Sequence, residues 1–101
     1  MCTPTRAQFV TGRYQIRYGM QHGGIRPDAQ VGVPLTETLV SNALKTCGYN
    51  TELIGKWHLG FFREEYCPQH RGFDHFVGFY TGSEDFYVLV QNTFFDFMWQ
   101  F

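Results

Sequence analysis

The chain has 101 residues, a formal net charge of −1 and a hydrophobic fraction of 44%, with 11 Phe and 6 Tyr. This length allows one small domain, and the hydrophobic fraction is that of a globular rather than a disordered chain. A net charge so close to zero gives no electrostatic reason to expect nucleic acid or an anionic membrane surface as a partner.

The first predicted element is a short helix over residues 3–11. Thr3 can serve as its N-cap, Pro4 suits the first helical position, and Gly12 can end it. Residues 13–34 contain Gly and Pro at short intervals, which predicts an irregular segment.

A second helix is predicted over residues 36–47, with Thr36 as its cap and Gly48 at its end. Its apolar residues recur at helical spacing: Leu39, Val40, Ala43 and Leu44. A short strand follows over residues 51–54, and Gly55 is expected to end it. A helix followed within a few residues by a strand favours an α/β sheet.

The rest of the chain offers fewer signals. Residues 61–85 predict a loop with short ordered pieces, and the weakly charged aromatic window over residues 88–101 predicts a tendency to aggregate. These few helices and strands would not offset the chain entropy of a complete domain. We therefore expect part of a larger α/β domain.

The three cysteines fit no closed set of disulfides and form no C-x-x-C pair. A zinc or thiol-redox module is accordingly the weakest interpretation of the sequence. Cys47 is expected to be a small buried side chain. No signal peptide pattern and no apolar run of membrane-spanning length occurs, so we expect no targeting signal and no membrane span in this chain.

The first candidate site is Cys2-Thr3-Pro4-Thr5-Arg6. A cysteine at the start of a helix lies near the backbone N–H groups and the positive end of the dipole, which favour a thiolate or a bound anion. Arg6 lies one turn further on and can direct its guanidinium toward the same anion. A buried cysteine beside a surface arginine is an equally good account of these residues alone.

The second candidate site is Gly55-Lys56-Trp57-His58-Leu59-Gly60, directly after the predicted strand. In extended backbone Lys56 and His58 project to one side and Trp57 to the other. Such a pair can hold an anion and protonate a leaving group. A solvated lysine and an ordinary hydrogen-bonded histidine are the alternative. A phosphate-binding P-loop is excluded because Trp57 stands in place of its Ser or Thr.

Together these segments resemble the sulfatase family. Cys2-Thr3-Pro4-Thr5-Arg6 with Thr11-Gly12-Arg13 matches one sulfatase signature, and the segment from Gly55 to Gly60 matches the second. The resemblance covers residues 2–87, and the tail over residues 88–101 differs from the family. It resembles the arylsulfatase B branch in three segments: Gly12-Arg13-Tyr14-Gln15-Ile16-Arg17, Gln21-His22 and Gly82-Ser83-Glu84-Asp85-Phe86-Tyr87. Arg71-Gly72-Phe73-Asp74 also resembles the family.

The resemblance implies a partial alkaline phosphatase-like sulfatase domain over residues 1–101, with a mixed sheet flanked by helices. It implies a sulfuric ester hydrolase in which Cys2 is oxidised to formylglycine by a separate formylglycine-generating enzyme. The hydrated aldehyde attacks the sulfate ester, and its second hydroxyl then expels the sulfate. One Ca²⁺ per site would neutralise the sulfate oxygens.

The same resemblance assigns roles to four residues. Cys2 would supply the nucleophile and, once modified, a metal ligand. Arg6 would stabilise the hydrated aldehyde, Lys56 would bind the sulfate, and His58 would contact the same region and help move protons. Other matching or neighbouring residues are expected to be structural, namely Arg13, Tyr14 and His22, or ordinary loop histidines, namely His70 and His75.

The expected substrate is a sulfate ester, and the arylsulfatase B branch acts on N-acetylgalactosamine 4-sulfate units of glycosaminoglycans. The implied location is lysosomal or secreted. The family pairs the position of Cys67 with a cysteine in a preceding loop, which residues 27–32 lack. The other calcium ligands are expected outside this chain, and Met1 directly precedes the motif. The alternative is therefore a noncatalytic truncated fragment that acts at most as a binding module, and we expect the isolated chain to be inactive.

Overall fold

The computed structural model describes residues 1–83, 90–91, 94–95 and 97–100, with side-chain surroundings described as far as residue 83. In these parts the elements follow one another as α1 (Cys2–Thr11), η1 (Gln15–Arg17), α2 (Val40–Thr46), β1 (Glu52–Lys56), η2 (Glu64–Tyr66), η3 (Pro68–His70), β2 (His75–Phe79), β3 (Val90–Gln91), β4 (Phe94–Phe95) and β5 (Phe97–Gln100).

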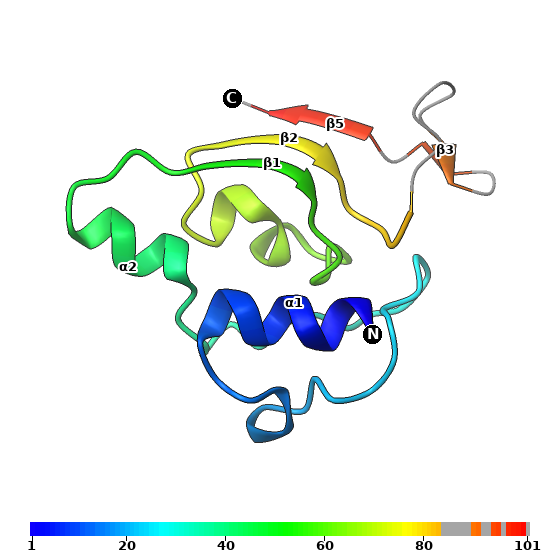
Figure 1. Ribbon diagram of the computed structural model, residues 1–101. Helices are drawn as coiled ribbons and strands as arrows, with labels where there is room; N and C mark the ends of the chain where they lie inside the picture. The colour runs from blue at the N-terminus through cyan, green and yellow to red at the C-terminus, as the bar shows by residue number, and fades with distance from the viewer. Residues whose placement is uncertain (84–89, 92–93, 96, 101) are drawn as a thin grey trace.

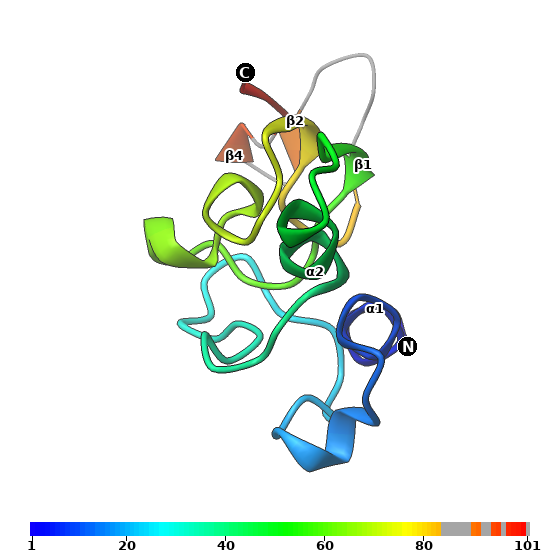
Figure 2. The ribbon, with the colours of Figure 1, turned by 90° about the vertical axis from the view of Figure 1, so that its left-hand side faces the viewer.

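A mixed sheet forms one layer of the molecule. β1 pairs with β2 in parallel and β2 pairs with β5 in antiparallel orientation, so the strand order is β1-β2-β5. β3 and β4 form a separate antiparallel pair. Both α-helices lie on one side of the mixed sheet (Figures 1 and 2). The predicted α/β class is confirmed. None of the described helices has the length and apolar character needed to cross a membrane.

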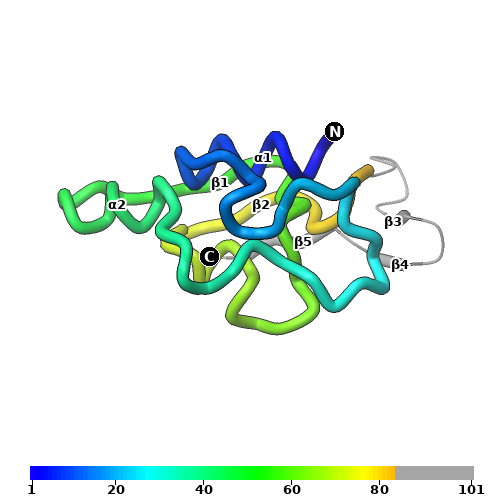
Figure 3. The backbone as a smooth tube through the Cα atoms, turned by 90° about the horizontal axis from the view of Figure 1, so that it is seen from below, coloured from blue at the N-terminus to red at the C-terminus, as the bar shows by residue number. Residues whose placement is uncertain are grey.

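Helix α1 begins at Cys2, and Gly12 ends it in the left-handed conformation with φ 67°. The helix and its end were predicted correctly, but Met1 rather than Thr3 is the N-cap. Thr3 is buried because its hydroxyl bonds to main-chain groups far along the sequence instead of to its own helix. The predicted irregular segment contains only η1, and it returns to the N-terminal end of α1 (Figure 3).

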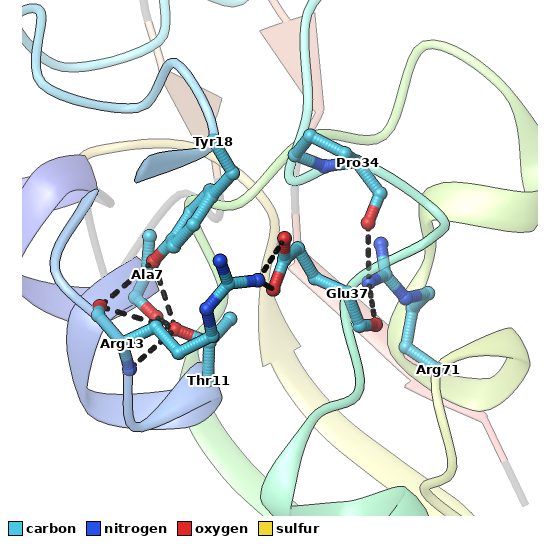
Figure 4. Close-up of polar contacts among 7 residues, drawn as sticks. All are labelled: Ala7, Thr11, Arg13, Tyr18, Pro34, Glu37 and Arg71. Atoms are coloured by element: carbon cyan, nitrogen blue, oxygen red, sulfur yellow. Dashed lines mark hydrogen bonds and ion pairs between the residues drawn. The ribbon is translucent and has the colours of Figure 1, made fainter. Parts of the chain in front are cut away.

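Helix α2 begins at Val40, four positions later than predicted, and Thr36 does not cap it. The guanidinium of Arg71 donates to the carbonyl oxygens of Val33, Pro34 and Glu37 at 2.7, 3.1 and 3.2 Å, and of these the Glu37 carbonyl lies within the predicted helix. The Glu37 carboxylate also accepts from Arg13 at 2.7 Å, which ties α1 to this segment (Figure 4). The helix ends at Thr46, one residue before the predicted end, with Cys47 as its C-cap, and Gly48 follows in the left-handed conformation with φ 86°.

Strand β1 continues through Gly55 to Lys56, so the prediction that Gly55 ends it was wrong. Gly55 lies opposite Gly78 of β2, and a Cβ atom on Gly78 would overlap the Gly55 carbonyl group. Two glycines therefore allow the strands to approach closely at this register. β2 itself lies inside the segment that was predicted as loop, so His75 is a strand residue.

The core lies between the sheet and the helices. Its buried members are Ala7, Met20, Val33, Leu39, Trp57, Leu59, Cys67, Phe76 and Tyr80. Trp57 satisfies its indole N–H by donating to the carbonyl of Gly60 at 2.9 Å. All three cysteines are free thiols; Cys67 is buried, whereas Cys47 is exposed, contrary to expectation.

A carboxylate joins the segments that lead into the two parallel strands. Asp74 accepts from the main-chain N–H of Thr51 at 2.9 Å and from the Lys45 ammonium at 2.7 Å. The hydrogen bond from Lys45, followed by that from the Thr51 N–H, lowers the pKa of Asp74 to about 2. This contact sets the register in which β1 and β2 begin.

Candidate active site

The first residue of α1 meets the last residue of β1. The hydrogen bond and the charge of Lys56 lower the pKa of the Cys2 thiol. Cys2 is exposed, so its thiol is accessible to solvent. Lys56 is held in place because its ammonium also donates to the carbonyl of Gly82 at 2.7 Å. The helix start and this lysine together make a position that favours an anion.

Arg6 joins the two elements from the helix side. Its Nε donates to the carbonyl of Trp57 at 3.1 Å, and its Nη2 donates to the carbonyl of Lys56. Burial lowers the pKa of Arg6, and the charge of Cys2 acts in the opposite direction. The guanidinium is thus within electrostatic reach of Cys2, but two of its donors hold the end of β1.

His58 leaves the extended path of the strand. Its φ is 56°, so the prediction of extended backbone through Lys56-Trp57-His58 fails at the last residue. The side chain is 5% exposed, and Nε2 lies 2.8 Å from the carbonyl oxygen of Ile25. A Cβ atom on Gly24 or on Gly82 would lie 3.0 Å from the His58 Cε1. The imidazole therefore fits between two glycines.

The four predicted site residues are brought together at this junction. Lys56 lowers the pKa of Cys2, Arg6 bonds to the main chain of Lys56 and Trp57, and both Lys56 and His58 adjoin Gly82. The elements that meet are the first turn of α1 and the C-terminal end of β1. Ligands of open α/β sheets usually bind beyond the carboxyl ends of parallel strands.

The residues expected to be structural make other contacts. Arg13 makes its ion pair with Glu37, and Tyr14 is 68% exposed. His22 is exposed and lines a hollow of about 300 Å³ together with Gly24 and Ile25. His70 lies 3.2 Å from a carboxylate oxygen of Glu64. Of the segment Gly82 to Tyr87, residues 84–87 lie outside the described residues.

The residues present do not form a calcium site by themselves. Calcium takes six to eight oxygen ligands. In the described part of the chain no group of three or more His, Cys, Asp and Glu side chains lies close enough together to hold a metal ion.

Three residues around His58 were not identified from the sequence. Thr3 was read as a cap, and Gly24 and Ile25 were read as part of an irregular segment. The Gly23-Gly24 pair indicated a turn, but nothing local to it pointed to a histidine far along the chain. Their role depends on tertiary contacts.

Comparison with known proteins gives a consistent result. The chain matches the family model described as Sulfatase over residues 1–96. It is 49% identical to arylsulfatase J of Mus musculus over 88 residues, which is 87% of this chain and 15% of that protein. It is 44% identical to arylsulfatase A of Homo sapiens over 79 residues, which is 77% of this chain and 16% of that protein.

A solved structure supports the same relationship. The crystal structure of Ps i-CgsB superposes with a TM-score of 0.79 at 36% identity, covering 84% of this chain and 19% of that one. This chain therefore spans less than a fifth of the length of these relatives.

Proposed function

This chain belongs to the sulfatase family, and we propose that it supplies the formylglycine precursor and part of the sulfate-binding site of a sulfate-ester hydrolase. Lys56 lowers the pKa of the Cys2 thiol at the start of α1. The observation that carries the proposal is that Arg6 of α1 donates to the carbonyls of Lys56 and Trp57, which joins the first turn of α1 to the end of β1. It places a cation and a helix N-terminus beside the residue that the family motif marks as the nucleophile precursor.

Cys2 is accessible to the modification that the proposal requires. Because the thiol is exposed, a separate formylglycine-generating enzyme can reach it. Once formed, the hydrated aldehyde supplies the oxygen that attacks sulfur, and its second hydroxyl allows the sulfate to leave afterwards.

Lys56 and Arg6 account for the recognition of a negatively charged sulfate. The Lys56 ammonium lowers the pKa of Cys2, and it is oriented because it donates to the Gly82 carbonyl. It can therefore bind sulfate oxygens without first being ordered. Arg6 adds positive charge from the next turn of α1 and holds the strand end that carries Lys56. His58 is the proposed group for moving protons near the leaving alcohol.

We propose one Ca²⁺ at this site, with most of its ligands supplied by residues other than those described here. N-acetylgalactosamine 4-sulfate of glycosaminoglycans is the proposed substrate, on the basis of the resemblance to the arylsulfatase B branch. A lysosomal or secreted location is proposed on the same basis.

Release of sulfate from an aryl sulfate tests the proposal. The protein is expressed from its native gene, so that any residues flanking this chain are included, together with a formylglycine-generating enzyme. It is compared with the Cys2→Ala and Cys47→Ala variants, because Cys2 and Cys47 are both exposed. We expect turnover in wild type and Cys47→Ala and its loss in Cys2→Ala. Equal turnover in Cys2→Ala would refute the proposed nucleophile, and no turnover in any form would support the noncatalytic alternative.

A further inference from the structure

Hydrogen bonds from three distant segments close a ring around His58. The main-chain N–H of Ile25 donates to the Thr3 hydroxyl at 3.0 Å, and that hydroxyl donates to the His58 carbonyl at 3.0 Å. The imidazole Nε2 lies 2.8 Å from the Ile25 carbonyl oxygen. We refer to these three residues as the Thr3–Ile25–His58 clasp.

From this clasp we infer that Thr3 and the main chain of Ile25 are positioning groups, which keep a proton on Nε2 of His58 so that the ring gains and loses protons at Nδ1. No role of this kind follows from the sequence motifs. It concerns how His58 is held, whereas its relevance to catalysis rests on the proposed function.

The directions of the hydrogen bonds support this inference. A carbonyl oxygen can only accept, so the bond between Nε2 and Ile25 requires the proton on Nε2. The Thr3 hydroxyl has a single hydrogen, which it gives to the His58 carbonyl, so its lone pairs are available to the Ile25 N–H. Each group in the ring thus has one consistent role.

The backbone of His58 explains why such support is needed. Among the residues that the structure describes, His58 is the one non-glycine residue with positive φ. That conformation is uncommon for a residue with a side chain and persists where the surroundings determine it. The Thr3 hydroxyl holds the His58 carbonyl, and the Tyr80 carbonyl accepts from its N–H at 2.9 Å. Both main-chain groups of His58 are therefore held.

Burial makes the clasp difficult to replace with water. Thr3 is 1% exposed and His58 is 5% exposed. Loss of the hydroxyl would leave the Ile25 N–H and the His58 carbonyl without these partners in a buried region, and unsatisfied buried groups are costly. The close fit against Gly24 and Gly82 also limits rotation of the ring.

Nuclear magnetic resonance of the ¹⁵N,¹³C-labelled 101-residue chain tests the inference without turnover. Spectra are recorded at a pH well above the pKa of an ordinary histidine. We expect His58 to show a protonated Nε2 and an unprotonated Nδ1, with slow exchange of the Nε2 proton. Exposed His22 is the internal control and is expected to show a mixture of tautomers. A mixture at His58 like that of His22, or a protonated Nδ1, would overturn the inference.

Two variants separate the hydroxyl from the shape of Thr3. Thr3→Ser keeps the hydroxyl and is expected to keep the His58 signal of wild type. Thr3→Val keeps the shape, and we expect its Nε2 proton to exchange at least about fivefold faster. Unchanged exchange in Thr3→Val would also overturn the inference; if that variant does not fold, the wild-type and Thr3→Ser spectra decide. Failure to find formylglycine at Cys2 would refute the proposed function but not the clasp.

Discussion

The ammonium of Lys56, the last residue of β1, lowers the pKa of the thiol of Cys2, the first residue of α1. The two ends meet because Arg6 donates to the carbonyls of Lys56 and Trp57 and because Thr3 donates to the carbonyl of His58. Two sequence motifs that are far apart in the chain thus become one site.

Replacement of Lys56 by Met is predicted to raise the pKa of Cys2, because the thiolate loses both its hydrogen bond and its nearby charge. The rate of alkylation of Cys2 by iodoacetamide near neutral pH should fall several-fold, with the exposed Cys47 as internal reference. The matched control is Lys45→Met, since Lys45 pairs with Asp74 before the strands begin. Equal alkylation of Cys2 in all three proteins would show that Lys56 does not influence the thiol.

Gly24→Ala is predicted to disturb His58, whereas Gly23→Ala is tolerated. A Cβ atom at residue 24 would lie 3.0 Å from the imidazole Cε1, which cannot move freely, while one at residue 23 would meet only the flexible end of Met1 at 3.1 Å. We expect Gly24→Ala to lower the free energy of unfolding by about 1 kcal/mol or more, as measured by urea denaturation. A greater loss in Gly23→Ala would contradict the packing described.

The sequence predicted the parts of this fold that depend on local signals. Pro4 and Gly12 mark α1, Gly48 follows the end of α2, and the two motifs contain the four residues that the structure brings together at the end of β1. The start of α2 was misplaced where Arg71, far along the chain, donates to the carbonyl oxygen of Glu37. β2 was missed because its extended state depends on pairing with β1.

The same limit applies to the site. Thr3 has the residue type of an N-cap, and only the tertiary structure shows that its hydroxyl serves His58 instead. The close approach of β1 and β2 at Gly55 and Gly78 also cannot be predicted from either segment alone. The local sequence does not distinguish a glycine within a strand from a glycine that ends one. The expected boundary between the family-like residues 2–87 and the differing tail over residues 88–101 stays a prediction.

Glu37→Ala is predicted to weaken the attachment of α1 to the segment before α2. The Glu37 carboxylate is 10% exposed and receives both of its hydrogen bonds from Arg13 at 2.7 Å. We expect a loss of about 1–2 kcal/mol in the free energy of unfolding. In Glu65→Ala, where the pair with Arg63 is exposed, we expect no comparable loss. Equal losses in the two variants would contradict this difference.

Acid is predicted to destabilise the protein through Asp74. Its pKa is lowered from 3.8 to about 2 in the folded state, so the unfolded chain binds the proton more readily. The stabilisation is complete above the unfolded pKa and is lost as the pH falls through the folded value. Urea denaturation from above pH 3.8 down to about pH 2 should show this loss of unfolding free energy in wild type.

Asp74→Asn should lack this part of the acid dependence and should unfold at lower urea than wild type near neutral pH. Asp28→Asn is the control. Asp28 and its partner Arg26 are both largely exposed, so their ion pair contributes little to stability. An acid dependence that is the same in Asp74→Asn and wild type would show that another group is responsible.

The central claim is that Cys2 is the precursor of formylglycine in a sulfatase. It is tested most directly by mass spectrometry of the tryptic peptide that contains Cys2 and ends at Arg6, prepared from protein of the native source. We predict a peptide lighter by the difference between a cysteine and a formylglycine residue, which reacts with an aldehyde-specific hydrazide. Unmodified cysteine in all of the peptide would contradict the claim.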